Sequence, residues 1–417
     1  MANQTSSVSD WWKLVVLLAS FLIHIMIWGL AFGAGVFQVA LINEFAKSDI
    51  IGPISLICSL IPTFTCAAGP VSSLLTNKYG CRKVGMIGSL VASLALFFTR
   101  FAHDIWFLLI AFSFLGIGLG IAYIPSVVIL CKYFDQRRPL AVSLAGSGLG
   151  FGTTIMPPVV QYLVDQWNWR NAVLLLSGVV LNIGALSALF HEPQIEDEND
   201  RVPLKSKMVH HIDMFKKSSF TLLWVNNFFI LFALVAFYIH LPTHLEKSGS
   251  IDNDFSAALL VSVVGVGTIL GRLVVGFVLQ CLTFPLLIYA STMVAGGLLM
   301  ICVPFLRTYW VLFTVLLGFG TVTSTLGPLL PLIISDMLGV ESLSTGYGYI
   351  LVAEALGSFL GPPFAGYLRD ILHDYTYPMV ISGSMIIFAS LVVVLPKIWT
   401  STFTTEKWIS TRYRLAL

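Results

Sequence analysis

GTTIMPPVVQYLVDQWNWRNAVLLLSG, residues 152–178, has a second version in this chain, GSFLGPPFAGYLRDILHDYTYPMVISG at residues 357–383. The two stretches align without a gap at a constant offset of 205, which is nearly half of the 417 residues. Identical positions include the paired prolines and the Tyr-Leu-x-Asp that follows them. Both copies lie in apolar sequence, so we expect two related halves embedded in a membrane. Parallel halves related by an axis along the membrane normal are one plan of secondary transporters, whose substrate binds between the halves.

Composition agrees with a membrane location. Hydrophobic residues make up 57% of the sequence and charged residues 11%, whereas about 25% of an ordinary soluble domain is charged. The excess apolar surface is therefore expected to face lipid. The net charge of +2 does not predict a nucleic-acid partner, because the basic residues stand at helix ends and form no single patch. The six cysteines are scattered without a CxxC pair, so neither a metal site nor a disulfide framework is expected.

Twelve apolar runs are each long enough to cross the hydrocarbon core, which takes about 20 residues. They lie at about 12–37, 52–75, 84–100, 105–131, 139–163, 170–190, 220–243, 256–280, 284–304, 309–334, 343–367 and 377–396. The sequence therefore predicts an all-α membrane protein with twelve transmembrane helices in two pseudo-symmetric six-helix bundles. The first run is too long for a signal peptide, so we expect it to be retained as a span. Asn226 and Asn227 are expected to begin and cap the seventh helix.

Basic residues set the expected orientation and the domain boundaries. With the N-terminus in the cytoplasm, most of the 23 lysine and arginine residues fall on the cytoplasmic side, as the positive-inside rule requires. Both termini are then cytoplasmic. We divide the chain into an N-terminal bundle (1–191), a cytoplasmic linker (192–219), a C-terminal bundle (220–398) and a cytoplasmic tail (399–417). The acidic run in the linker is expected to be solvated.

A weaker echo links the fourth and tenth helices. Leu115-Gly116-Ile117-Gly118 resembles Leu317-Gly318-Phe319-Gly320, and we align these glycines in that register. Small residues let helix backbones approach closely, so the glycines are expected to serve helix packing.

The loop GPVSSLLTNKYGCRKV at 69–84 resembles the signature loop of the major facilitator superfamily. The resemblance implies that Asn77, Lys78 and Arg82 bond helix ends and acidic partners on the cytoplasmic face in one conformation and release them in the other. Many relatives have Asp where this chain has Asn77, and the amide would weaken such a charge latch. Plain anchoring of the cytoplasmic face by positive charge is the alternative.

Three further segments resemble the monocarboxylate transporter family, in matching order. KYFDQRRPLAVSLAGSGLGFG (132–152) resembles its loop between helices four and five. GRLVVGF (271–277) resembles its eighth-helix arginine segment, and LVAEALGSFLGPPFAGYLRD (351–370) its eleventh helix. The resemblance covers about 10–398. It implies the major facilitator fold and the transport of small monocarboxylates or related zwitterions across the plasma membrane.

Arg272 is the main candidate for substrate binding. A cation in the centre of a bilayer costs about 2.5–3.5 kcal/mol on insertion scales, so it must face a wet cavity or a partner. The family resemblance implies that it binds the substrate carboxylate, to which a guanidinium donates two parallel hydrogen bonds. Pairing with Glu354 is the alternative. Glu354 itself serves as a proton carrier or as a structural partner. His24, midway along the first span, either adjusts the charge or is a hydrogen-bonded neutral side chain.

The chain departs from the family pattern at two positions. Proton-coupled lactate and pyruvate carriers have an aspartate one turn before the eighth-helix arginine, where this chain has Thr268. They have a lysine in the first helix, where the alignment gives Phe32. Because the usual proton relay is missing, we favour facilitated or weakly proton-coupled transport of another small acid, a zwitterion or a guanidino compound. Arg272, Glu354, His24, Thr268 and Phe32 are the predicted substrate-binding residues.

The expected function is secondary transport by alternating access, with the site lined by helices one, four, five, seven, eight, ten and eleven. Arg138 matches a family position near the cytoplasmic gate, with anchoring to lipid headgroups as the alternative, and Arg137 beside it is also a predicted gating residue. The sequence has no Walker A, HExxH or GxSxG motif, so neither an enzyme nor a cofactor is predicted. A non-transporting membrane sensor or scaffold is the second hypothesis. Some family members need a single-span immunoglobulin-like glycoprotein to reach the cell surface, and the sequence leaves that partner open.

Overall fold

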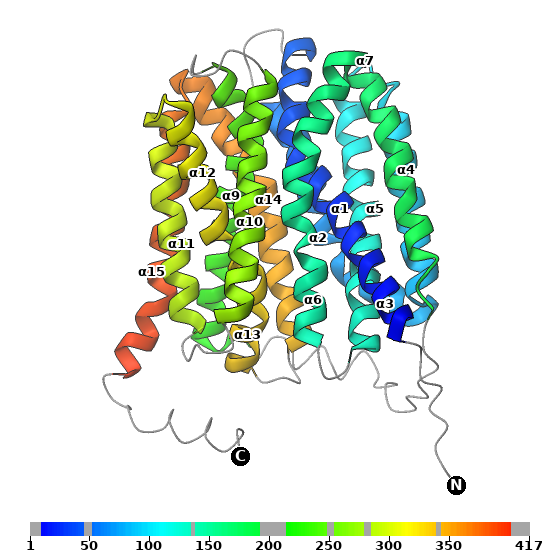
Figure 1. Ribbon diagram of the computed structural model, residues 1–417. Helices are drawn as coiled ribbons and strands as arrows, with labels where there is room; N and C mark the ends of the chain where they lie inside the picture. Colours follow the sequence, from blue (N-terminus) through cyan, green and yellow to red (C-terminus); the bar gives the residue numbers. More distant parts are fainter. Residues whose placement is uncertain are drawn as a thin grey trace.

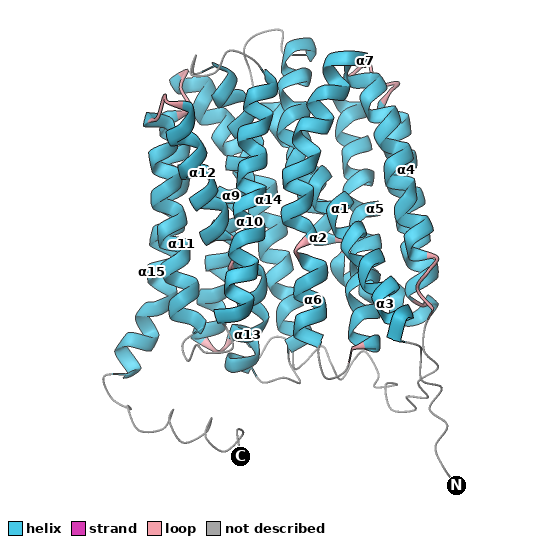
Figure 2. Ribbon diagram, in the orientation of Figure 1, coloured by secondary structure: helices cyan, strands magenta, loops and turns pink. Residues whose placement is uncertain are grey.

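The computed structural model describes residues 10–45, 52–134, 138–191, 214–247, 254–278, 285–338 and 343–401, which are helical apart from short turns (Figure 2). Ten stretches are long and apolar enough to cross a membrane. One of them, Leu140–Ser187, has 48 residues, about twice the length of one crossing. Its helix is interrupted at Asn168, where φ is 68° and the chain turns back (Figure 1). Counting its two arms separately and adding α14 gives twelve crossings in the described part of the chain.

The first six crossings, the N-terminal half, contain seven helices. They are α1 (Asp10–Phe45), α2 (Gly52–Ala67), α3 (Gly69–Tyr79), α4 (Cys81–Thr99), α5 (Ile105–Tyr133), α6 (Arg138–Gly146) and α7 (Gly148–Ser187). The C-terminal half contains α9 (Ser218–Lys247), α10 (Asp254–Val278), α11 (Pro285–Cys302), the short η1 (Val303–Phe305), α12 (Tyr309–Thr323), α13 (Leu326–Leu338), α14 (Leu343–Leu372) and α15 (Thr376–Ser401).

The two ends of the bundle can be named after α1, which runs its full length. The lower end in Figure 1 carries the start of α1 and the end of α15, and is called the Asp10 end. The upper end carries the bend of α7 and the last turn of α1, and is called the Phe45 end.

Three of the described crossings are divided into two helices, one of them at Ala68 between α2 and α3, and the breaks in the other two lie next to the site. α6 and α7 meet at Ser147, while α12 and α13 are separated by Ser324 and Thr325. At each of these two breaks a hydroxyl group donates to a carbonyl three residues earlier, from Ser147 to Leu144 at 2.6 Å and from Ser324 to Thr321 at 2.8 Å. Such bonds compete with the helix ladder and bend the chain locally.

The repeated segment occupies equivalent places in the two halves. A Cβ atom on Gly152 would lie 2.4 Å from the Ile25 carbonyl oxygen, so α7 crosses α1 backbone to backbone. A Cβ atom on Gly357 would lie 2.3 Å from the Phe228 carbonyl oxygen, so α14 crosses α9 in the same way. The repeat therefore encodes one close helix crossing in each half, which confirms the prediction of two related bundles.

The predicted register between the fourth and tenth helices is wrong by two residues. A Cβ atom on Gly116 would lie 2.8 Å from the Ile61 carbonyl oxygen on α2. The position with the same contact is Gly320, whose Cβ atom would lie 2.0 Å from the Val264 carbonyl oxygen on α10. Gly318, which the sequence pairs with Gly116, does not make this contact. Because each segment has glycines two residues apart, the sequence alone does not distinguish the pairing of Gly116 with Gly318 from its pairing with Gly320.

Three helix pairs make most of the contact between the halves: α1 with α9, α2 with α14, and α7 with α10. A Cβ atom on Gly35 would lie 2.7 Å from the Tyr238 carbonyl oxygen, which shows how closely α1 approaches α9. A Cβ atom on Gly265 would lie 2.4 Å from the Thr154 amide nitrogen, and α7 and α10 are equally close. The halves thus touch along glycine-lined seams, with the space between them left to larger polar and aromatic side chains.

Candidate functional site

Arg272 lies on α10 at the junction of the two halves. Its Nη1 donates a hydrogen bond to the carbonyl oxygen of Gly146, the last residue of α6. On its other side, a Cβ atom on Gly327 at the start of α13 would lie 3.1 Å from Nη2. The guanidinium therefore sits between the two helix breaks, one from each half. Its Nε atom is buried and has no hydrogen-bond partner in the part of the chain that the structure describes.

The alternative in which Arg272 pairs with Glu354 is wrong for this conformation. Within the residues that the structure describes, the ion pairs are Arg170 with Glu44 and Arg369 with Asp370. Neither Arg272 nor Glu354 takes part in one. Arg272 is partly buried. Among the described residues, no acidic side chain forms an ion pair that would compensate its charge.

Three tyrosines lie within electrostatic range of Arg272, and they come from different helices. Tyr123 on α5, Tyr238 on α9 and Tyr347 on α14 are all close enough to interact with its charge electrostatically. His24 on α1 also lies within this range and packs its ring edge-on against Tyr123, at 5.2 Å between centroids. The prediction that His24 is a hydrogen-bonded side chain agrees with the structure, since its Nδ1 lies 2.8 Å from the Ser20 carbonyl oxygen and donates to it.

Phe32 and Thr268 meet at Tyr238. The Phe32 ring lies 4.5 Å from the Tyr238 ring and stacks on Trp28, and both Phe32 and Thr268 are buried. The Thr268 hydroxyl donates to the Val264 carbonyl oxygen at 3.0 Å and lies near the Tyr238 side chain. The structure thus brings four of the five predicted residues to one aromatic group. Neither the Phe32 ring nor the Thr268 hydroxyl carries a charge.

Glu354 lies on α14, buried to 9% exposure. It lies within electrostatic range of Tyr123 and Tyr347, two of the tyrosines that are within such range of Arg272. Its other neighbours of this kind are Cys66 on α2 and Tyr289 on α11. The predicted lining by helices one, four, five, seven, eight, ten and eleven therefore omits the second and ninth helices. Polar side chains inside the second and ninth apolar runs were the sequence signal that could have predicted that these helices also line the site.

Asn226 and Asn227 do not cap a helix, and that prediction is wrong. α9 begins at Ser218, two turns earlier, and the two side chains are 1% and 0% exposed. The Tyr289 hydroxyl donates to Asn226 Oδ1 at 2.7 Å. Asn226 Nδ2 and Asn227 Oδ1 have no partner among the described residues. This amide pair is a functional candidate that the sequence analysis misassigned, because it gave a capping role to two residues inside the apolar run at 220–243.

The predicted gating residues lie at the Asp10 end. Lys78 and Arg82 are exposed, and the Lys78 ammonium lies 5.1 Å from the Tyr79 ring. Neither forms an ion pair with an acid in the described ranges. Arg137 and the side chains of Asn77 and Arg138 lie outside the described residues. The charge latch therefore stays a prediction.

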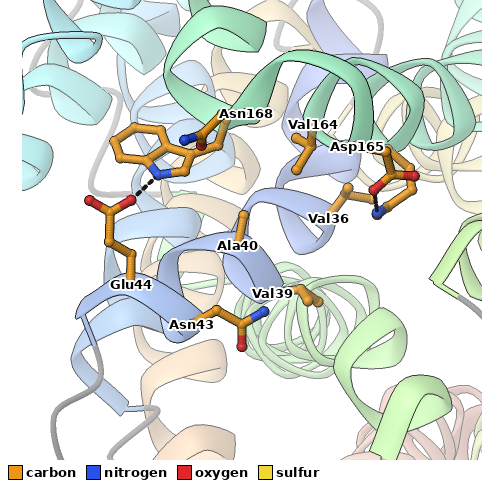
Figure 3. A pocket seen from close by; sticks show the side chains of 10 residues that line it. Val36, Val39, Ala40, Asn43, Glu44, Val164, Asp165 and Asn168 are labelled. Carbon is orange, nitrogen blue, oxygen red and sulfur yellow. Dashed lines mark hydrogen bonds between the residues drawn. The ribbon is translucent and has the colours of Figure 1, made fainter.

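The Phe45 end carries a cavity of about 420 Å³ between α1 and α7 (Figure 3). Two acids line it. Glu44 accepts hydrogen bonds from the Trp169 indole and, at 2.5 Å, from Arg170, while Asp165 accepts one from Gln161 at 2.8 Å. None of the five predicted substrate-binding residues lines this cavity. It is a separate polar recess at the end of the bundle.

A hydrogen bond crosses between the halves near the Phe45 end. Gln38 on α1 lies 3.1 Å from Nδ1 of His240 on α9, whose Nε2 lies 2.9 Å from the Pro362 carbonyl oxygen. Because a carbonyl only accepts, Nε2 carries the hydrogen and Nδ1 accepts from the Gln38 amide. With the close packing at Gly35, this bond holds α1 against α9 on the Phe45 side of the Arg272 site.

Comparison with known proteins places this arrangement in context. The model of the Major Facilitator Superfamily matches residues 16–362. Monocarboxylate transporter 12 of Xenopus laevis is 28% identical, over 87% of this chain and 83% of that protein. Monocarboxylate transporters 14 and 11 of Homo sapiens are 28% and 29% identical, each over 93% of this chain and over 91% and 83% of their own lengths. The similarity extends over nearly the whole chain, which confirms the family resemblance noted in the sequence.

Proposed function

Because this chain belongs to the major facilitator superfamily and is similar along its length to monocarboxylate transporters, we propose that it carries a small organic acid or zwitterion across the plasma membrane. It is a multi-pass secondary transporter and not an enzyme. The proposed mechanism is alternating access, in which the halves rock about the Arg272 site. The proposed transport is facilitative or weakly proton-coupled, with the Asp10 end in the cytoplasm.

The guanidinium of Arg272 is the observation that carries this proposal. It lies between the halves, faces the broken ends of α6 and α13, and lacks an acidic partner among the described residues. A carboxylate would supply the missing charge and accept from the free Nε. The Gly146 carbonyl belongs to the other half, so a substrate carboxylate that competes for the guanidinium would also change a contact between the halves.

The weak proton coupling rests on Thr268 and Phe32. Neither side chain titrates, and both are packed against Tyr238. His24 donates through Nδ1 to the Ser20 carbonyl oxygen, so it is held as a hydrogen-bonded ring beside Tyr123. These contacts support transport that follows the substrate gradient.

The test is counterflow in reconstituted vesicles. We expect Arg272→Ala to lower exchange of the transported acid more than about tenfold, since a hydrogen-bonded charge contributes about 1.5–3 kcal/mol. Arg272→Lys is expected to recover only part, because an ammonium lacks the planar fork. Arg307→Ala, which removes an exposed arginine in the loop before α12, is the control. Unchanged exchange by Arg272→Ala would refute the site, and absence of counterflow with a broad panel of small acids would favour a sensor or scaffold.

A further inference from the structure

The cavity of about 420 Å³ between α1 and α7 has no part in the proposed transport mechanism, and it carries an uncompensated negative charge (Figure 3). Of its two acids, Glu44 is paired with Arg170 at 2.5 Å. Arg170 also donates to the Ala102 carbonyl oxygen at 3.0 Å and stacks on the Trp169 ring at 4.4 Å, so it is held at one side. Asp165 is exposed and forms no ion pair with any residue that the structure describes.

The internal repeat supplies a second version of this place in the same molecule. The offset of 205 pairs Asp165 with Asp370 and Val164 with Arg369. It also pairs Asn168 with His373, whose φ angles are 68° and 54°. In the described part of the chain these two are the non-glycine residues with positive φ. The backbone therefore turns in the same way after both copies, and the paired positions are structurally equivalent.

In the C-terminal half, the equivalent place holds a cation. Arg369 is 8% exposed, its Nη1 lies 3.4 Å from an Asp370 carboxylate oxygen, and its guanidinium lies 5.8 Å from the Tyr375 ring. The Tyr375 ring lies 5.7 Å from the ring of His240 on α9. The guanidinium is therefore packed where α14 faces α9, and the cavity lies where the equivalent pair, α7 and α1, face each other.

The N-terminal half lacks that built-in cation. Val164, the counterpart of Arg369, lines the cavity, and it is shorter than arginine and uncharged. The space beside Asp165 is therefore open, although the carboxylate is kept. A cation with N–H groups suits it, because such groups form short, charge-assisted hydrogen bonds with carboxylates.

We propose that this cavity binds a small cation with N–H donors, of the guanidinium or primary ammonium class, in the place that Arg369 fills in the other half. Asp165 would compensate its charge, and Glu44 would accept a further hydrogen bond, since a carboxylate has about four lone-pair sites. The site is separate from Arg272, because none of the predicted substrate-binding residues lines it. An occupant would contact α1 at Val36 and Val39, on either side of the residue that bonds to His240.

The first test is protection of a cysteine probe in the detergent-purified full-length protein. Asn43→Cys places a thiol in the cavity wall, and its alkylation by a maleimide is followed by site-resolved mass spectrometry. We expect methylguanidinium at millimolar concentrations to slow this alkylation several-fold, a weak affinity being normal for exposed ion pairs. Tetramethylammonium, which has no N–H group, should leave the rate unchanged, as should either cation with His103→Cys in the turn before α5. Equal slowing by both cations, or by neither, would overturn the proposal.

The second test changes the charge of the cavity while the Asn43→Cys probe is kept. Asp165→Asn retains an acceptor for Gln161 and removes the charge, so we expect the protection to be lost. Asp104→Asn, at an exposed acid in the turn before α5, is the matched control and should keep it.

Val164→Arg supplies the cation that the other half already has. We expect it to slow alkylation without any ligand and to abolish the further effect of methylguanidinium. Full protection in either Asp165→Asn or Val164→Arg would overturn the proposal. Because alkylation reports no transport, such a result would leave the assignment of Arg272 standing.

Discussion

At the residue scale, the site depends on polar side chains that are costly to place in a bilayer. Arg272 is tolerated because Gly146 accepts one of its hydrogen bonds and because three tyrosine side chains lie within electrostatic range of its charge. Glu354 has no charged partner of its own among the described residues. Intramembrane ionisable residues of this kind mark functional sites more often than structural ones.

The Tyr289–Asn226 hydrogen bond is expected to stabilise the side of the site that carries Glu354. Tyr289→Phe removes the donor and leaves a second atom of the Asn226 amide without a partner. Interhelical hydrogen bonds in membranes contribute on average about 0.6 and at most about 1.7 kcal/mol, so we expect a loss of this size in the free energy of unfolding. Thermal denaturation in detergent measures it. Tyr377→Phe, which alters an exposed ring, should change nothing, and equal stability of the two variants would contradict the assignment.

At the element scale, glycine decides which helices touch. The close crossings of α1 with α9 and of α7 with α10 depend on glycines whose Cβ atoms would collide with the partner backbone. Backbone cannot move aside as a flexible side chain can, so even one methyl group at such a position should separate the helices.

Gly35→Ala is expected to loosen the contact between α1 and α9. The added Cβ atom would lie 2.7 Å from the Tyr238 carbonyl oxygen and 2.8 Å from that of Ile239. We expect a several-fold fall in counterflow and faster labelling of a Gln38→Cys probe by an impermeant maleimide. Gly33→Ala is the matched control on the same helix, because its nearest contact would be an ordinary 3.8 Å to Met156. Identical behaviour of the two variants would show that this crossing does not control access.

At the scale of the whole molecule, two similar halves meet along three helix pairs around one polar centre. α1 is held against α9 on the Phe45 side by the Gln38–His240 bond, while Arg272 bonds to Gly146 nearer the Asp10 end. In alternating access, the contact on the Phe45 side and the contact nearer the Asp10 end would have to break in turn. Because each is a hydrogen bond between helices, breaking it costs little free energy.

The proposed orientation is tested by labelling intact cells with a membrane-impermeant maleimide in a Cys302→Ser background. Cys302 is exposed at the Phe45 end and would otherwise react. We expect His103→Cys, in the exposed turn between α4 and α5, to react from outside. Lys78→Cys, exposed at the Asp10 end, is expected to react only after permeabilisation. The reverse pattern would place the Asp10 end outside the cell.

The sequence by itself determined the membrane fold, the pairing of the two halves and the family. Hydropathy over about 20 residues is a local property, and the repeat at 152–178 and 357–383 is visible without knowing any contact. Arg272, Glu354 and His24 were found for the same reason, since a charged or titratable residue inside an apolar run needs an explanation wherever it lies.

Only the tertiary structure decided which of these residues meet. Tyr123, Tyr238 and Tyr347 come from three helices far apart in the sequence, and the packing of α5, α9 and α14 brings them within electrostatic range of Arg272. The separation of Arg272 from Glu354 and the register of Gly116 with Gly320 are likewise set by packing. Hydropathy fixes that a helix lies in the bilayer, but its rotation and its neighbours follow from contacts between helices, which no single run of sequence contains.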